Sequence, residues 1–156
     1  MKNPKNNAFH LSPFPLLSRS GDISYFITTR AGGVSDGPYA SLNLGLHSGD
    51  DRSRVLENRK ILAARLGVSS EQILTPRQIH ADGIALIDDT YFSLPDEAKA
   101  GRLSEADALI TAKRGWYVAV STADCVPVLL FAPDRQVVAA VHAGWRGTVK
   151  EIAGKT

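Results

Sequence analysis

The single cysteine and the four histidines are the residues from which this sequence could build a metal site. The histidines are His10, His47, His80 and His142, and the cysteine is Cys125. Neutral imidazole and thiolate are ligands that zinc prefers in proteins, so few ligand sets are available here. A lone cysteine in an apolar segment is also commonly a small buried hydrophobe, and this alternative stays open from the residues alone.

A predicted hairpin brings Cys125 and His142 together. Two apolar runs, 126–131 and 137–141, flank Ala-Pro-Asp-Arg-Gln, a segment too short for a parallel crossover. A turn centred on the Pro-Asp pair places Cys125 directly opposite His142, with Cβ atoms about 4.5–5.5 Å apart. One zinc ion can bridge such a pair, because its bonds to sulfur and nitrogen are about 2.0–2.3 Å long.

A third protein ligand and one open position would make the site catalytic rather than structural. His80 lies in Gln-Ile-His-Ala-Asp-Gly, before a predicted turn, and His47 lies in Leu-His-Ser-Gly-Asp. Periodicity places neither histidine beside the hairpin, so both remain candidates at this point.

The residues after His142, Ala-Gly-Trp-Arg-Gly, resemble a ligand-binding corner. Glycines flank Arg146 where the strand ends, just before a helical pattern that begins at Thr148. Helix N-termini attract anions, and a guanidinium can bind phosphate through two parallel hydrogen bonds. The plain alternative for Arg146 is a solvated surface charge.

The elements that must position these residues are one clear helix and several strands. Residues 51–66 carry an apolar stripe at helical spacing, and Gly67 supplies a stop. The predicted strands are 23–29, a short piece after residue 73, 84–88, 116–122, 126–131 and 137–141, with a short apolar piece at 108–111. The last two strands are almost wholly apolar, which predicts cover on both faces. Residues 30–37 form a glycine-rich loop, and 90–104 are predicted to be a polar loop.

Length and composition indicate one globular domain. The chain has 156 residues, 44% hydrophobic and 22% charged, with a net charge of +2. No segment gathers Lys and Arg into a patch, which argues against nucleic acid. One cysteine excludes a disulfide framework, no apolar run approaches the roughly 20 residues that span a bilayer, and no signal peptide is recognised, so a cytoplasmic location is expected.

The predicted organisation is an irregular segment, 1–22, followed by a single catalytic domain, 23–156. The helical pattern that begins at Thr148 stops within two turns, too short to bury a full face. We therefore expect the domain to be truncated at its C-terminus.

Several motifs resemble those of one known family, and the resemblance runs from about Ile23 to the C-terminus. The motifs are TTRAGGVSDGPYASLNLG, the helix with ENR, QIHADG, ADALIT, ADCVPVLL and VAAVHAGWRGT. By these motifs the chain resembles the YfiH family, also called the laccase-domain or polyphenol oxidase family. The resemblance implies an α/β (α+β) fold, a layered α-β-β-α sandwich with a mixed sheet, similar to a bacterial toxin that carries a Cys–His hydrolase pair.

The resemblance also implies the site. The family's zinc ligands fall on His80, Cys125 and His142, which favours His80 over His47. Further substrate- or phosphate-binding positions that the resemblance or the corner suggests are Arg30, Asn43, Arg59 and Arg146. Arg59 can instead be a snorkelling surface residue on its helix. Family members continue past the GWRGT motif with a further motif that is absent here, which again predicts a missing C-terminal part.

The function implied by the resemblance is that of a zinc-dependent purine nucleoside phosphorylase, a transferase. Such an enzyme splits adenosine, inosine, guanosine or methylthioadenosine with phosphate into the base and ribose-1-phosphate. Its partners would be a purine nucleoside and phosphate, with neither nucleic acid nor membrane. Adenosine deamination, a hydrolase activity, is implied beside it.

Two other classes of enzyme do not match the sequence. A multicopper oxidase needs about ten histidines for its copper centres, and this sequence has four. The H-x-E and P-C-x-x-C pattern of zinc nucleobase deaminases is absent. Two alternatives remain: a metal-free cysteine hydrolase with Cys125 as nucleophile and His142 as base, and a nucleotide-binding module without turnover.

Overall fold

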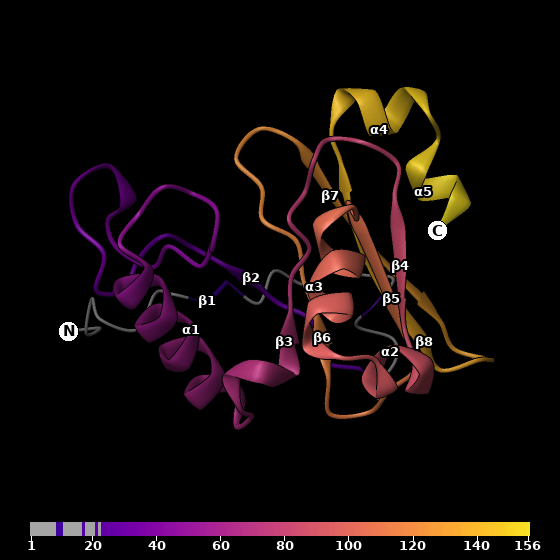
Figure 1. Ribbon diagram of the computed structural model, residues 1–156, viewed down its shortest axis with the longest axis horizontal. Coiled ribbons are helices and arrows are strands. Elements are labelled where there is room, and N and C mark those ends of the chain that lie inside the picture. The colour runs from indigo at the N-terminus through magenta and orange to yellow at the C-terminus, as the bar shows by residue number, and fades with distance from the viewer. Residues whose placement is uncertain (1–8, 11–16, 18–20, 22) are drawn as a thin grey trace. The chain divides into compact units, whose positions relative to one another are not determined.

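The computed structural model describes residues 9, 10, 17, 21 and 23–156, and the chain divides into two units (Figure 1). The first unit spans Met1–Ser70 and the second Glu71–Thr156. Most of the segment 1–22, predicted to be irregular, lies outside the described residues. That residues 23–156 act as one catalytic domain stays a prediction.

Helix α1 (Arg52–Leu66) is the main element of the N-terminal unit and confirms the helix predicted at 51–66. The side chain of Asp51 accepts a hydrogen bond from the backbone N–H of Ser53 at 2.7 Å and so caps the first turn. Gly67 ends the helix in the left-handed conformation, with φ 70°.

Among the described residues, two of the predicted strand 23–29 belong to a sheet. Strand β2 (Ile27–Thr28) pairs antiparallel with β1 (Phe9–His10). A 3-10 helix, η2 (Gly37–Tyr39), lies at the end of the glycine-rich loop.

Asn58, which is fully buried on α1, holds the loops of this unit together. Its amide group donates to the hydroxyl of Ser35 and to the carbonyl of Asn43, both at 2.9 Å, and its oxygen accepts the N–H of Val34 at 2.8 Å. Gly33 passes so near that a Cβ atom there would lie 2.4 Å from the Asn58 oxygen. The loop therefore needs a glycine for close approach.

The C-terminal unit contains a four-stranded mixed sheet, in agreement with the mixed sheet predicted above. Strands β4 (Ile84–Ile87) and β5 (Ala108–Thr111) run parallel, whereas β5 pairs antiparallel with β8 (Val137–Ala143), and β8 pairs antiparallel with β7 (Val126–Ala132). A smaller parallel pair joins β3 (Ile73–Leu74) to β6 (Tyr117–Val118), so the strand predicted at 116–122 is short. The 3-10 helix η3 (Ser70–Gln72) precedes β3.

Two helices occupy most of residues 90–104, so the prediction of a polar loop there is wrong. Asp88 caps α2 (Asp89–Ser93) by accepting the N–H of Tyr91 at 2.9 Å. Helix α3 (Asp96–Ser104) starts after a proline and carries two acidic residues in its first turn, which favour a helix N-terminus. Tyr91 is buried with Ala85, Ile87, Ala106 and Leu109 in one core cluster.

The hairpin forms as predicted, but its register differs. Pro127, not Cys125, lies opposite His142, because the turn leaves four residues, 133–136, between the paired ends of β7 and β8. The predicted direct pairing of Cys125 with His142 is therefore wrong by two positions. A shift of two preserves the face of the sheet, so both side chains still lie on the same side.

Strand β7 is an edge strand, and none of its residues is buried. Val126 is 61% exposed, so the predicted cover on both faces does not hold for β7. Strand β8 is buried over four of its residues. The helical pattern expected from Thr148 begins earlier, as α4 (Trp145–Val149), and continues as α5 (Ile152–Lys155), whose Ile152 packs in a second core cluster.

None of the helices in the described part of the chain is long and apolar enough to cross a lipid bilayer.

We predict that Asn58→Leu destabilises the protein by about 1–3 kcal/mol, because the N–H of Val34 and the hydroxyl of Ser35 lose their buried partner. Urea denaturation followed by circular dichroism measures the change. Glu57→Gln, at an exposed position on the same helix, is the control and should shift stability by less than about 0.5 kcal/mol. Equal stability of the two variants would contradict the role given to Asn58.

Candidate metal centre

Three side chains that can bind a metal meet in the C-terminal unit. The candidate ligand atoms of His80, Cys125 and His142 all lie within 4.8 Å of one another. The two imidazole rings are nearly perpendicular, at 88°, with centroids 4.7 Å apart. His142 is only 2% exposed, whereas His80 is exposed. One tetrahedral ion with bonds of about 2.0–2.3 Å fits this donor set of two nitrogens and one sulfur.

Each of the three residues comes from a different segment. His142 lies near the end of β8, Cys125 immediately precedes β7, and His80 lies in the turn between β3 and β4. Among the described residues, this is the one group of three metal-binding side chains, and His47 does not belong to it. The structure thus brings together the three residues that the family motifs suggested.

A buried aspartate ties two of these segments to one another. Asp107, directly before β5, accepts a hydrogen bond from Nδ1 of His142 at 2.8 Å. The same carboxylate accepts the backbone N–H groups of Ile79, His80 and Ala81 at 3.1, 2.9 and 3.0 Å. It is fully buried. Sequence reasoning missed Asp107, and the only available signal was its place in the ADALIT motif.

A glutamine ties the segment of His80 to that of Cys125. The Gln78 side chain donates to the backbone carbonyl of Ser121 and accepts the N–H of the same residue, both at 2.7 Å. This reciprocal pair holds the two loops in fixed register. Sequence reasoning also missed Gln78, although it begins the QIH motif.

Gly144 lies beneath the three candidate ligands. A Cβ atom at this position would be 3.3 Å from Cδ2 of His80, 3.4 Å from Sγ of Cys125 and 3.5 Å from Cε1 of His142. The backbone there has φ −67° and ψ 165°, which any residue can adopt. A side chain here would therefore crowd the ring of His80 slightly and fill the space beside Cys125 and His142, whereas the backbone conformation itself does not require glycine.

The surroundings of Cys125 oppose a free thiolate. Burial raises the pKa of its thiol above the ordinary value, and the nearby carboxylates of Asp124 and Asp107 raise the pKa further. A thiolate at this position needs a compensating positive charge, and a bound divalent cation would provide one.

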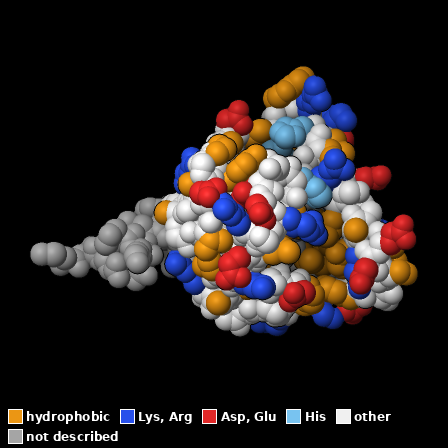
Figure 2. All heavy atoms as spheres, turned by 60° about the vertical axis from the view of Figure 1, so that its left-hand side comes forward, with side chains coloured by type: hydrophobic (Ala, Val, Ile, Leu, Met, Phe, Trp, Pro, Cys, Tyr) orange, Lys and Arg blue, Asp and Glu red, His pale blue; other side chains and the backbone are white. Residues whose placement is uncertain are grey.

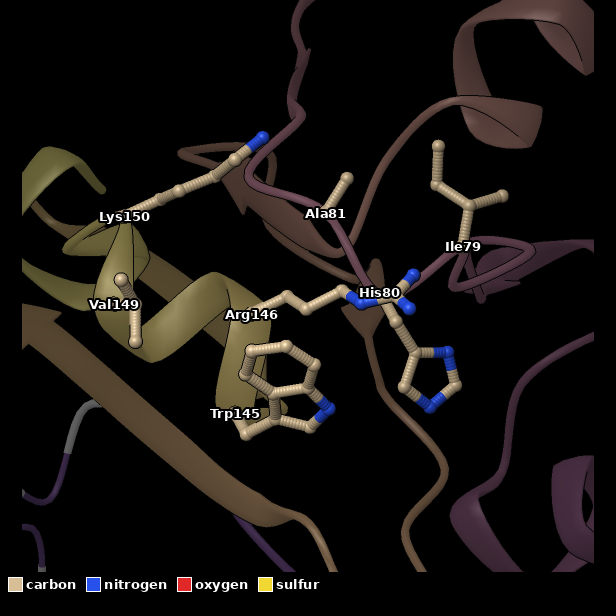
Figure 3. A pocket seen from close by; sticks show the side chains of 7 residues that line it. All are labelled: Ile79, His80, Ala81, Trp145, Arg146, Val149 and Lys150. Atoms are coloured by element: carbon tan, nitrogen blue, oxygen red, sulfur yellow. The ribbon is translucent and has the colours of Figure 1, made fainter.

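His80, one of the three candidate ligands, also lines a pocket of about 340 Å³ (Figure 3). Its lining residues are Ile79, His80, Ala81, Trp145, Arg146, Val149 and Lys150. The guanidinium of Arg146 lies 5.2 Å from the centre of the Trp145 ring, and this indole is 72% exposed. Nζ of Lys150 forms an ion pair with Oδ1 of Asp82 at 3.0 Å. His80 therefore belongs both to the cluster and to the pocket wall.

The other predicted substrate residues lie in the N-terminal unit, where their side chains make local hydrogen bonds. Arg30 donates to the carbonyls of Ala40 and Pro38 at 2.6 and 3.1 Å. Asn43 donates to Ser48 at 2.7 Å and to Asp50 at 3.0 Å. Arg59 donates to the carbonyl of Leu44 at 3.4 Å. A substrate role for Arg30, Asn43 and Arg59 stays a prediction.

Charges are mixed on the face drawn in Figure 2, where Lys and Arg side chains are interspersed with Asp and Glu. Histidine side chains reach the surface on this face. Within the described residues shown there, positive charge is not gathered into one patch. Arg146 places one positive charge at the pocket.

Comparison with known proteins gives a consistent result. A family model described as "Multi-copper polyphenol oxidoreductase laccase" matches residues 24–156. A purine nucleoside phosphorylase of Bacteroides thetaiotaomicron is 42% identical over 140 residues, covering 90% of this chain and 52% of that protein. One from Corynebacterium glutamicum is 45% identical over 138 residues, covering 88% and 54%. A protein named adenosine deaminase RL5, from an unknown prokaryotic organism, is 40% identical over 131 residues, covering 84% and 50%.

Solved structures agree in fold. The crystal structure of YlmD from Geobacillus stearothermophilus matches with a TM-score of 0.73 and 39% identity, over 83% of this chain and 48% of that one. The YfiH protein of Bacillus licheniformis matches with a TM-score of 0.70 and 34% identity, over 83% and 49%. The chain thus has the predicted α+β fold, and it spans about half the length of the curated relatives that it matches.

We predict that Gly144→Ala lowers zinc affinity by up to about tenfold, because the added methyl group would contact all three candidate ligands and crowd the ring of His80, which restricts how they can adjust around an ion. Competition with a chelating dye measures the affinity. Gly154→Ala is the matched control, since a Cβ atom there meets nothing within 4 Å. Unchanged affinity in Gly144→Ala would mean that the ligands do not close around this glycine.

Proposed function

The chain belongs to the family described as multi-copper polyphenol oxidoreductase laccase, and we propose that it carries the zinc centre of a purine nucleoside phosphorylase. Relatives 42% and 45% identical to it bear the name purine nucleoside phosphorylase. The observation that carries the proposal is that His80, which lies in one cluster with Cys125 and His142, also lines a pocket together with Arg146.

In the proposed reaction, phosphate displaces the purine from C1′ of the ribose. The bond from C1′ to the base nitrogen breaks, a bond from C1′ to a phosphate oxygen forms, and the base nitrogen takes up a proton. Adenosine, inosine, guanosine and methylthioadenosine are the proposed substrates. Zinc, when bound, would supply Lewis-acid polarisation of an oxygen at the position left open by three protein ligands.

Arg146 is the residue that we assign to phosphate. No ion pair to its guanidinium is found within the described part of the chain, and its side chain faces the pocket next to His80 (Figure 3). Helix α4 has only five residues, so the side-chain charge and not the helix terminus carries this assignment. A guanidinium can bind a phosphate through two parallel hydrogen bonds, which fixes its orientation as well as its position.

A metal-free cysteine hydrolase is the second candidate, and one observation favours it. Asp107 is bonded to His142, which in turn lies close to Cys125, an order that resembles an orienting acid, a base and a nucleophile. The raised thiol pKa of Cys125 weighs against this candidate, because an efficient nucleophile needs the thiolate. Metal analysis separates the two functions.

We predict that the purified protein contains about one equivalent of zinc, and that Cys125→Ala, His80→Ala and His142→Ala each lose most of it, because three ligands leave no spare. Elemental analysis for zinc, copper and iron makes the measurement. His47→Ala is the control and should keep its zinc, since His47 lies outside the cluster. Retention of zinc by all three variants, or stoichiometric copper instead of zinc, would overturn the proposal.

We predict that Arg146→Lys raises the KM for phosphate about tenfold while leaving the KM for adenosine nearly unchanged, because a point charge cannot reproduce two parallel hydrogen bonds. The assay separates adenine and ribose-1-phosphate from inosine and ammonia, so phosphorolysis and deamination are scored independently. Arg135→Lys, in the exposed hairpin turn, is the matched control. An unchanged phosphate KM would remove Arg146 from the phosphate site, and products limited to inosine and ammonia would favour a deaminase.

A further inference from the structure

We propose that Asp107 is a positioning residue that sets both histidines of the centre at once. Its carboxylate fixes the ring of His142 and, separately, the backbone of the turn that carries His80. This inference rests on the proposed zinc centre. It assigns a role to a buried acid that lies 28 residues from Ile79 and 35 from His142 in the chain.

The carboxylate of Asp107 is saturated with donors. Oδ1 accepts from Nδ1 of His142 at 2.8 Å and from the N–H of His80 at 2.9 Å. Oδ2 accepts from the N–H groups of Ile79 and Ala81 at 3.1 and 3.0 Å. Two carboxylate oxygens offer about four acceptor positions, and the ring donor and three backbone donors occupy them. No capacity remains for a direct bond to a metal, so its action passes through the two histidines.

The turn at His80 has the shape of an anion-binding nest. Gln78 and His80 have φ 58° and 60°, in the left-handed region that non-glycine residues seldom adopt. Such alternation makes successive backbone N–H groups converge on one point, where an anion stabilises them. Here the anion is the side chain of Asp107. Without this carboxylate the three backbone N–H groups lose their acceptor. The left-handed conformation that places the His80 side chain beside Cys125 and His142 is then no longer stabilised.

The same carboxylate selects the tautomer of His142. Three backbone N–H groups already use the oxygens of Asp107 as acceptors, so in its contact with His142 the carboxylate is best placed to accept again, and Nδ1 then carries the proton. Nε2 is then left as the ligand atom beside Cys125 and His80. Partners of this kind commonly orient metal-binding histidines, and their removal typically weakens metal binding by about tenfold to a hundredfold.

Two control positions separate this role from plain effects of charge and stability. Asp124 is an exposed carboxylate close to Cys125, so Asp124→Asn removes a similar charge near the centre without touching the nest. Thr111 is buried on β5, four residues after Asp107, and donates to the carbonyl of Ile87 at 2.7 Å. Thr111→Val therefore removes a buried hydrogen bond from β5, the strand that follows Asp107, without changing a contact to either histidine.

The test compares zinc affinities of the wild-type protein, Asp107→Asn, Asp124→Asn and Thr111→Val by competition with a chelating dye. Asp107→Asn places an amide N–H₂ against donors that need an acceptor, and we expect its affinity to fall about tenfold to a hundredfold. The decrease in zinc affinity of each control variant should be at least ten times smaller than that of Asp107→Asn. An affinity of Asp107→Asn equal to that of either control would overturn the inference.

A second measurement uses wild-type protein alone and does not depend on how the variant folds. Long-range ¹⁵N–¹H correlation spectra of the metal-free protein at mildly alkaline pH report which ring nitrogen of His142 carries the proton. We expect the Nδ1–H tautomer, and the Nε2–H tautomer would overturn the inference. A wild-type protein that binds no zinc but shows the Nδ1–H tautomer would refute the zinc centre while supporting the orientation by Asp107.

Discussion

A buried carboxylate that must be fully hydrogen-bonded is the constraint on which the candidate centre depends. Charge removed from water is costly unless partners replace the water, and Asp107 finds its partners on two different segments. The hydrogen bonds to Asp107 hold the turn that carries His80 close to the end of β8 and fix the orientation of the His142 ring. The geometry of the centre is therefore a consequence of a polar requirement in the interior and not of the candidate ligands attracting one another.

The N-terminal unit solves a similar problem with a neutral group. Asn58 on α1 is fully buried, and its amide satisfies groups at Ser35, Asn43 and Val34. In each unit one buried polar side chain forms hydrogen bonds to several loop segments. These buried hydrogen bonds fix the loop conformations together with the burial of apolar residues such as Leu42.

The arrangement of Asp107, His142 and Cys125 is compatible with more than one chemistry. His142 is oriented by Asp107 and lies beside Cys125, which serves a zinc site and a cysteine–histidine pair equally well in geometry. The difference is electrostatic, because burial and nearby carboxylates disfavour the thiolate of Cys125 unless a cation is present. The chemistry of the site is thus decided by what occupies it, with the same protein scaffold in either case.

The sequence by itself determined what depends on neighbouring residues. The apolar stripe of residues 51–66 and the stop at Gly67 predict α1, and the two apolar runs around a short turn predict the β7–β8 hairpin. The family motifs select the three candidate ligands. Helices α2 and α3 were missed because their start signals, an aspartate cap and an acidic first turn, sit in a polar segment without a long apolar stripe.

Only the tertiary structure decided the hairpin register and the partners of the centre. The predicted pairing of β7 with β8 was wrong by two residues. The length of the turn depends on the backbone conformation of a few residues, including Gln136 with φ 53°, and not on the apolar pattern. Asp107 and Gln78 bind groups 26 to 43 residues away along the chain. Such contacts exist only once the sheet has closed, since local spacing carries no information about which distant donors a buried acceptor will meet.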